Sequence, residues 1–281
     1  MVNILKTIVL LGILSVLFIV IGGAIGGKSG LYFALFISLL LNVGAYFFSD
    51  KLALSASGAK PLDEKKYPEL HKMIKELAHS MNIPMPKLYI TPMQQANAFA
   101  TGRDPDHASV AVTEGILKIL SKDELRGVLA HELAHVKNRD ILVSSIAAVL
   151  ASAISFIANM AMFGGFTNNE DDDNPLAGVL GIVAALIVPI AAMIIQFAIS
   201  RQREYGADET GAKTIGSGKS LAKALVAIHD TTRQAPARVN PAYSSLYIEN
   251  PTGGLGGKLM NLFSTHPPVE ERVKRLEKIS L

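Results

Sequence analysis

Residues 121–137 read SKDELRGVLAHELAHVK and predict an amphipathic helix with a well-marked start. Ser121 and Glu124 form a capping-box pattern, in which the serine hydroxyl accepts the backbone N–H three residues on and the glutamate reaches back. Leucine and valine then recur at three- and four-residue intervals, which predicts one apolar face turned towards a core. His131 and His135 stand one helical turn apart, so a helix makes their imidazoles neighbours.

These histidines and the glutamate between them match the His-Glu-x-x-His pattern of zinc peptidases. In that pattern the histidines bind one metal ion, and the glutamate, here Glu132, is the base that activates water. A catalytic zinc site takes a third protein ligand and leaves a fourth position open. We expect Glu204 to be that ligand, and Asp208, one turn later, to accept the second ring hydrogen of a ligand histidine. A hydrogen-bonded core histidine pair and a solvated acidic face are the alternatives.

The composition indicates a membrane protein, because 49% of the residues are hydrophobic. Four apolar segments are each near the ~20 residues that a bilayer requires. They cover residues 7–26, 31–49, 141–165 and 176–200. We therefore expect an α-helical membrane protein with four transmembrane helices, two within residues 1–50 and a hairpin at residues 141–200.

The distribution of basic residues predicts the orientation in the membrane. Of the 27 Lys and Arg residues, 13 lie between residues 51 and 140 and 12 follow residue 200. The loop between the last two spans has none and carries residues 170–173, Glu-Asp-Asp-Asp. The positive-inside rule therefore places both large polar segments, 51–140 and 201–281, in the cytoplasm. Since the candidate ligands come from both, we expect the two segments to fold together as one peptidase domain, with the hairpin inserted in it.

Charge and cysteine content exclude other classes of protein. A net charge of +3 from dispersed basic residues indicates no nucleic-acid partner. The chain has no cysteine, which fits a reducing compartment and excludes disulfides and thiolate metal sites.

The motifs together resemble the HtpX family of membrane zinc metallopeptidases, relatives of the eukaryotic CAAX prenyl proteases. The resemblance rests on His131-Glu132-x-x-His135, on Glu204-x-x-Ala207-Asp208 and on the flanking apolar spans, and covers nearly the whole chain. It implies a mainly α, α+β zincin-like (gluzincin) catalytic domain. It further implies one Zn²⁺ per chain, held by the two histidines and Glu204, with Glu132 as the catalytic base.

The first polar segment also predicts a helix and a small sheet. Residues 67–81 have a helical apolar pattern, and residues 87–90, 97–101 and 109–113 suggest short strands of an antiparallel sheet. The resemblance puts residues 97–102 at the sheet edge that binds substrate as an added strand. The substrate-binding residues expected there are Asn97, Ala98, Phe99 and Ala100. An ordinary core strand is the alternative from the residues alone.

His266, in the stretch Ser264-Thr265-His266-Pro267-Pro268, leaves two roles open. It could stabilise the oxyanion of the transition state, as a further hydrogen-bond donor in the cleft. A turn-forming structural role before the last helix is the other reading.

The resemblance implies an endopeptidase of the bacterial or archaeal inner membrane, multi-pass, that hydrolyses misfolded or damaged membrane proteins in quality control and stress response. Its expected partners are unfolded or membrane protein substrates, the lipid bilayer and other membrane proteases. Two alternatives stay open: a processing protease for specific lipidated C-termini, and a non-catalytic membrane scaffold with structural zinc. The intact Glu132 argues against the scaffold.

Overall fold

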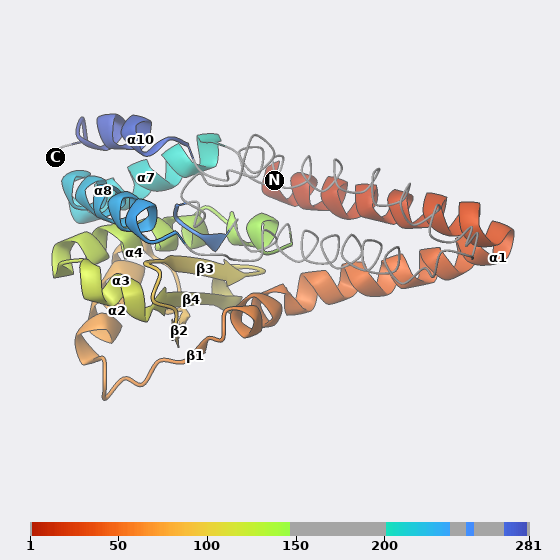
Figure 1. The fold of residues 1–281 in the computed structure, drawn as a ribbon, viewed down its shortest axis with the longest axis horizontal. Coiled ribbons are helices and arrows are strands. Elements are labelled where there is room, and N and C mark those ends of the chain that lie inside the picture. Colours follow the sequence, from red (N-terminus) through yellow and green to blue (C-terminus); the bar gives the residue numbers. More distant parts are fainter. Residues whose placement is uncertain (1, 147–200, 237–245, 250–266, 280–281) are drawn as a thin grey trace, which may run out of the picture.

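The structure is a computed structural model that describes residues 2–146, 201–236, 246–249 and 267–279. It begins with α1 (Val2–Ala56), which turns back on itself at Gly27 to form a hairpin (Figure 1). Gly27 has φ 57° and ψ −141°, a conformation that glycine adopts readily. The two arms are tied by Asn42, whose Nδ2 donates to Ser15 Oγ at 2.7 Å.

The second arm of α1 is the membrane-span candidate within the described residues. Residues 27–56 form a helix long and apolar enough to cross a bilayer, and only 17% of its most apolar window is buried. An apolar helix left this exposed is not a core helix of a globular domain. The predicted spans at 7–26 and 31–49 both lie in α1, whereas those at 141–165 and 176–200 fall outside the described residues, apart from the helical residues 141–146.

The sheet has four strands in the order β1-β2-β4-β3. The strands are β1 (Lys60–Pro61), β2 (Lys87–Thr91), β3 (Ala98–Gly102) and β4 (Ala108–Thr113). The prediction of an antiparallel sheet is wrong for its central pair, because β2 and β4 are parallel while β1–β2 and β3–β4 are antiparallel. The cause is the position of β3, which makes a hairpin with β4 through the 3₁₀ turn η1 (Pro105–His107) and takes the edge, so that β4 runs alongside β2 in the same direction.

Helix α4 (Lys122–Lys137) lies at the centre of the domain, between the sheet with α2 (Pro68–Met81) and α3 (Glu114–Ile119) and the later helices (Figure 1). The predicted capping box is confirmed: Ser121 and Glu124 make both of its hydrogen bonds. The predicted helix at 67–81 is also confirmed as α2.

The later helices are α7 (Arg201–Ile215), α8 (Lys219–Gln234) and α10 (Val269–Leu276). Two glycines bring α4 close to α8 and α7. A Cβ on Gly127 would lie 2.6 Å from the backbone N of Leu221 in α8, and a Cβ on Gly211 of α7 would lie 3.0 Å from the backbone N of His131. Close backbone approach therefore fixes α7 against the histidine face of α4.

Candidate metal centre

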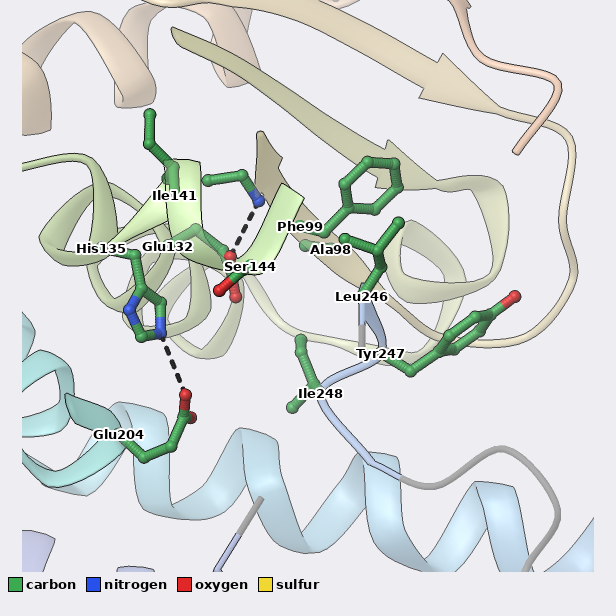
Figure 2. Close-up of a pocket in the computed structure, with 11 residues that line it drawn as sticks. Ala98, Phe99, Glu132, His135, Ile141, Ser144, Glu204, Leu246, Tyr247 and Ile248 are labelled. Atoms are coloured by element: carbon green, nitrogen blue, oxygen red, sulfur yellow. Dashed lines mark hydrogen bonds and ion pairs between the residues drawn. The ribbon is translucent and has the colours of Figure 1, made fainter. Parts of the chain in front are cut away.

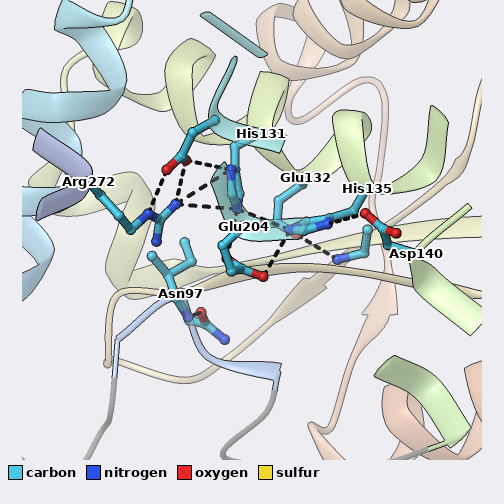
Figure 3. Close-up of polar contacts among 10 residues, drawn as sticks. Asn97, His131, Glu132, His135, Asp140, Glu204 and Arg272 are labelled. Carbon is cyan, nitrogen blue, oxygen red and sulfur yellow. Dashed lines mark hydrogen bonds and ion pairs between the residues drawn. The ribbon is translucent and has the colours of Figure 1, made fainter. Parts of the chain in front are cut away.

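The structure brings the predicted ligands together on two helices that pack against each other. His131 and His135 come from consecutive turns of α4, and Glu204 comes from the first turn of α7 (Figure 3). Each offers one ligand atom, and these atoms all lie within 4.8 Å of one another. Among the described residues this is the group of three metal-binding side chains that could hold an ion.

The spacing of the donor atoms fits a tetrahedral zinc ion. Two ligands at about 2.05 Å from a tetrahedral centre stand about 3.3 Å apart. The Nε2 atoms of His131 and His135 are 3.2 Å apart. Glu204 Oε1 lies 3.5 Å from His135 Nε2, and its Oε2 lies 3.6 Å from His131 Nε2. Two imidazoles and one carboxylate are also the donor set of many catalytic zinc sites.

Both imidazoles are oriented by a carboxylate on the other ring nitrogen. Asp208 Oδ1 lies 2.9 Å from His131 Nδ1, the contact expected from the sequence. Asp140 Oδ2 lies 3.2 Å from His135 Nδ1. Carboxylates in these positions hold the ring hydrogen on Nδ1, so that Nε2 is the nitrogen that binds a metal.

The sequence interpretation missed Asp140, which follows the C-terminal end of α4. Arg139 has a positive φ of 59°, and the chain turns so that the backbone N–H of Asp140 donates to His135 O at 2.9 Å. The available signal was an acidic residue directly after a helix that ends in a ligand histidine. Helical spacing does not indicate it, because Asp140 lies beyond the helix.

Arg272 of α10 is the second functional candidate that the sequence interpretation missed. It is fully buried, and it donates to both oxygens of Asp208, at 2.9 Å from Nε and 2.7 Å from Nη2 (Figure 3). A bidentate arginine–carboxylate pair is a strong and directional contact. Through it the last helix helps to hold Asp208 against His131.

Electrostatics of this cluster follow from burial and paired charges. Burial lowers the pKa of His131, but its hydrogen bonds to Asp208 and Glu204 outweigh burial and raise the pKa to about 9. Burial raises the pKa of Asp208, but Arg272 and His131 lower it to about 2. Asp208 is therefore a carboxylate at neutral pH, and a metal ion must displace a proton from His131 to bind there.

Glu132 lies beside these ligands and faces a cleft that His135 and Glu204 also line (Figure 2). The side chain is buried, and its Oε2 accepts the backbone N–H of Ala100 at 3.0 Å. The carboxylate is thus held between the metal-ligand helix and the edge strand β3.

The residues predicted to bind substrate lie along the same cleft, with one exception. Ala98, Phe99 and Ala100 belong to β3, the edge strand, and line the cleft. Asn97 precedes the strand, and its buried side chain bonds instead to the backbone of residues 246 and 248. His266 lies outside the described residues.

Comparison with known proteins decides the family. The profile of peptidase family M48 matches residues 64–280. The chain belongs to this family. It is 49% identical over 282 residues to a "Protease HtpX homolog" of Pelotomaculum thermopropionicum, covering 99% of this chain and 100% of that protein. It is 53% identical over 266 residues to one of Aquifex aeolicus, covering 92% of this chain and 87% of that protein.

A solved structure shows the same fold. The crystal structure of S. mikatae Ste24p superposes with a TM-score of 0.52 at 19% identity, covering 98% of this chain and 66% of that chain. The chain therefore spans slightly less than two thirds of that relative. Membership of family M48, with protease relatives of near full length, makes the chain a membrane metallopeptidase.

Proposed function

We propose that this M48 peptidase is a zinc endopeptidase that hydrolyses misfolded or damaged membrane proteins at the cytoplasmic face of the cell membrane. The observation that carries the proposal is the buried His131, His135 and Glu204 group, with Glu132 beside it in a cleft bordered by the edge strand β3.

The donor set supports one zinc ion per chain. Zinc held by these residues would supply a bound water with a pKa of about 7 and would polarise the scissile carbonyl. Asp208 and Asp140 keep the two imidazoles in the metal-binding tautomer, at 2.9 and 3.2 Å from their Nδ1 atoms.

Glu132 is the general base of this proposal. Its Oε2 is fixed by the N–H of Ala100, which leaves the other oxygen to take a proton from the attacking water and pass it to the leaving amine. The backbone N–H of Gly102, two residues along the same edge, donates to Ser145 Oγ at 3.3 Å. We propose that an extended substrate binds along this edge strand, a mode that gives affinity with little dependence on sequence.

The hairpin at the N-terminus supports the proposed membrane position. Phe99 of the cleft packs in one cluster with Ala53 and Leu54, at the end of α1 that leaves the apolar span. The cleft therefore lies next to the membrane-span candidate, where exposed loops of other membrane proteins are within reach. We further propose that residues 51–140 and 201–281 form the catalytic domain, that residues 141–200 are a transmembrane hairpin inserted in it, and that the chain spans the bacterial or archaeal inner membrane four times.

The test uses membranes that contain this protein and a membrane protein destabilised by a core substitution, beside its stable parent. The proposal predicts fragments of the destabilised protein with the wild-type enzyme, none with Glu132→Gln, and little cleavage of the parent. Equal cleavage of both substrate proteins would contradict the quality-control role while leaving the peptidase assignment standing.

A further inference from the structure

Residues 246–249 are here called the strap, and its residues Leu246, Tyr247 and Ile248 line the cleft beside the start of β3 (Figure 2). The Asn97 side chain binds the backbone of the strap. The Asn97 side chain donates from Nδ2 to Leu246 O at 2.9 Å, and its Oδ1 accepts the N–H of Ile248 at 2.9 Å. Both ends of the Asn97 amide are therefore engaged by the chain's own backbone, and the side chain is only 2% exposed.

Two side chains of the strap are part of the hydrophobic core. Leu246 packs with Phe99 and the end of α1, whereas Ile248 belongs to the main core of the domain. Tyr247 Oη contacts Met93 Sδ at 3.6 Å, and the Tyr247 ring points away from Glu132 and His135 (Figure 2). A segment with buried side chains on both sides is costly to displace.

The rest of the cleft is apolar. Apart from Glu132, His135, Glu204 and Ser144, its described lining consists of alanine, aliphatic and aromatic residues. Ile248 lies between Leu246 and Glu204 (Figure 2). An apolar space beside the metal ligands favours an apolar substrate side chain, because charged groups lose hydration there without gaining a partner.

We propose that the strap is a fixed wall of the substrate cleft, that Asn97 is a positioning residue for this wall rather than a substrate contact, and that Ile248 limits the size of the apolar substrate side chain accepted beside the scissile bond. This inference rests on the proposed peptidase function.

The first experiment maps the cleavage sites of an unfolded protein, casein, by mass spectrometry. Ile248→Ala is expected to shift the preferred residue next to the cleaved bond from small aliphatic towards larger aliphatic and aromatic side chains. Val226→Ala is the matched control, because Val226 is an exposed aliphatic residue of α8 outside the cleft lining, and it should leave the map unchanged. An Ile248→Ala map identical to that of the wild type overturns the role of Ile248.

The second experiment measures kinetics and accessibility for Asn97. Asn97→Ala should bind zinc as the wild type does but lose about tenfold in kcat/KM, mostly through KM, because two hydrogen bonds to the wall are gone. Asn97→Asp keeps the acceptor for Ile248 N–H but sets a buried carboxylate oxygen against Leu246 O, so it should lose at least as much as Asn97→Ala. In the naturally cysteine-free chain, a Tyr247→Cys reporter should react with a maleimide about tenfold faster when Asn97→Ala is added.

The outcomes distinguish failure of this inference from failure of the proposed peptidase function. If Asn97→Ala cleaves as fast as the wild type or faster, the strap is dispensable or occupies the substrate's place, and the inference is overturned although the protein is a peptidase. An unchanged maleimide rate also overturns it. If the wild type itself shows no chelator-sensitive cleavage, the proposed function fails and the inference falls with it.

Discussion

Arg272 tests whether the C-terminal helix holds the metal centre in place. Arg272→Met keeps most of the buried side-chain volume but leaves Asp208 as a buried carboxylate without the two hydrogen bonds at 2.9 and 2.7 Å. Removing one partner of a buried ion pair costs roughly 3–5 kcal/mol of unfolding free energy. For a domain of this size each kcal/mol lowers the melting temperature by roughly 2–4 °C, so we expect a fall of roughly 6–20 °C.

The control is Arg275→Met on the same helix. Arg275 is exposed, pairing with Glu271 at 3.3 Å and lying 3.7 Å from the centroid of the Tyr205 ring, and its loss should cost at most about 1 kcal/mol. The assay is thermal unfolding of detergent-purified, metal-depleted protein. Adding Asp208→Asn to Arg272→Met should restore part of the loss, because the buried carboxylate that has lost its arginine partner is removed. If the melting temperature of Arg272→Met falls by no more than that of Arg275→Met, the buried pair does not hold α10 in place, and this reasoning is refuted.

Three further predictions concern the metal ligands, the helix packing and pH. Asp140→Asn should weaken zinc binding about 10- to 100-fold in a chelator competition, whereas Asp104→Asn, which removes a similar contact to the exposed His107, should not. Gly127→Ala should cost about 1–3 kcal/mol of stability by urea unfolding, since its Cβ would lie 2.6 Å from Leu221 N, while Gly206→Ala has open space and should be neutral or stabilising. The pKa of Asp208 falls from 3.8 to about 2 on folding, so its contribution to the free energy of unfolding is present above pH 4 and lost towards pH 2. If the difference in unfolding free energy between the wild type and Asp208→Asn stays constant across this range, the assignment is contradicted.

Local patterns predicted the parts of the site that lie on single helices. His131, Glu132 and His135 share one helix, and Glu204 and Asp208 share another, so helical spacing was enough to place each set on one face. The capping box at Ser121 predicted the start of α4 for the same reason.

Long-range contacts could not be read from such patterns. Arg272 meets Asp208 across 64 residues of sequence, and Asn97 meets residue 246 across 149. No period or motif links such positions, since the packing of α10 on α7 and the return of the strap to β3 bring them together. The parallel pairing of β2 and β4 has the same origin, because it depends on which strand takes the sheet edge.

The measurement that tests the central claim most directly is zinc titration of metal-depleted protein with casein cleavage as the readout. The account predicts that activity rises to a plateau at one zinc per chain, that a chelator abolishes it, and that Glu132→Gln binds the same amount of zinc without cleaving. Cleavage that persists in Glu132→Gln, or that is unaffected by chelation, would contradict the assignment of this site.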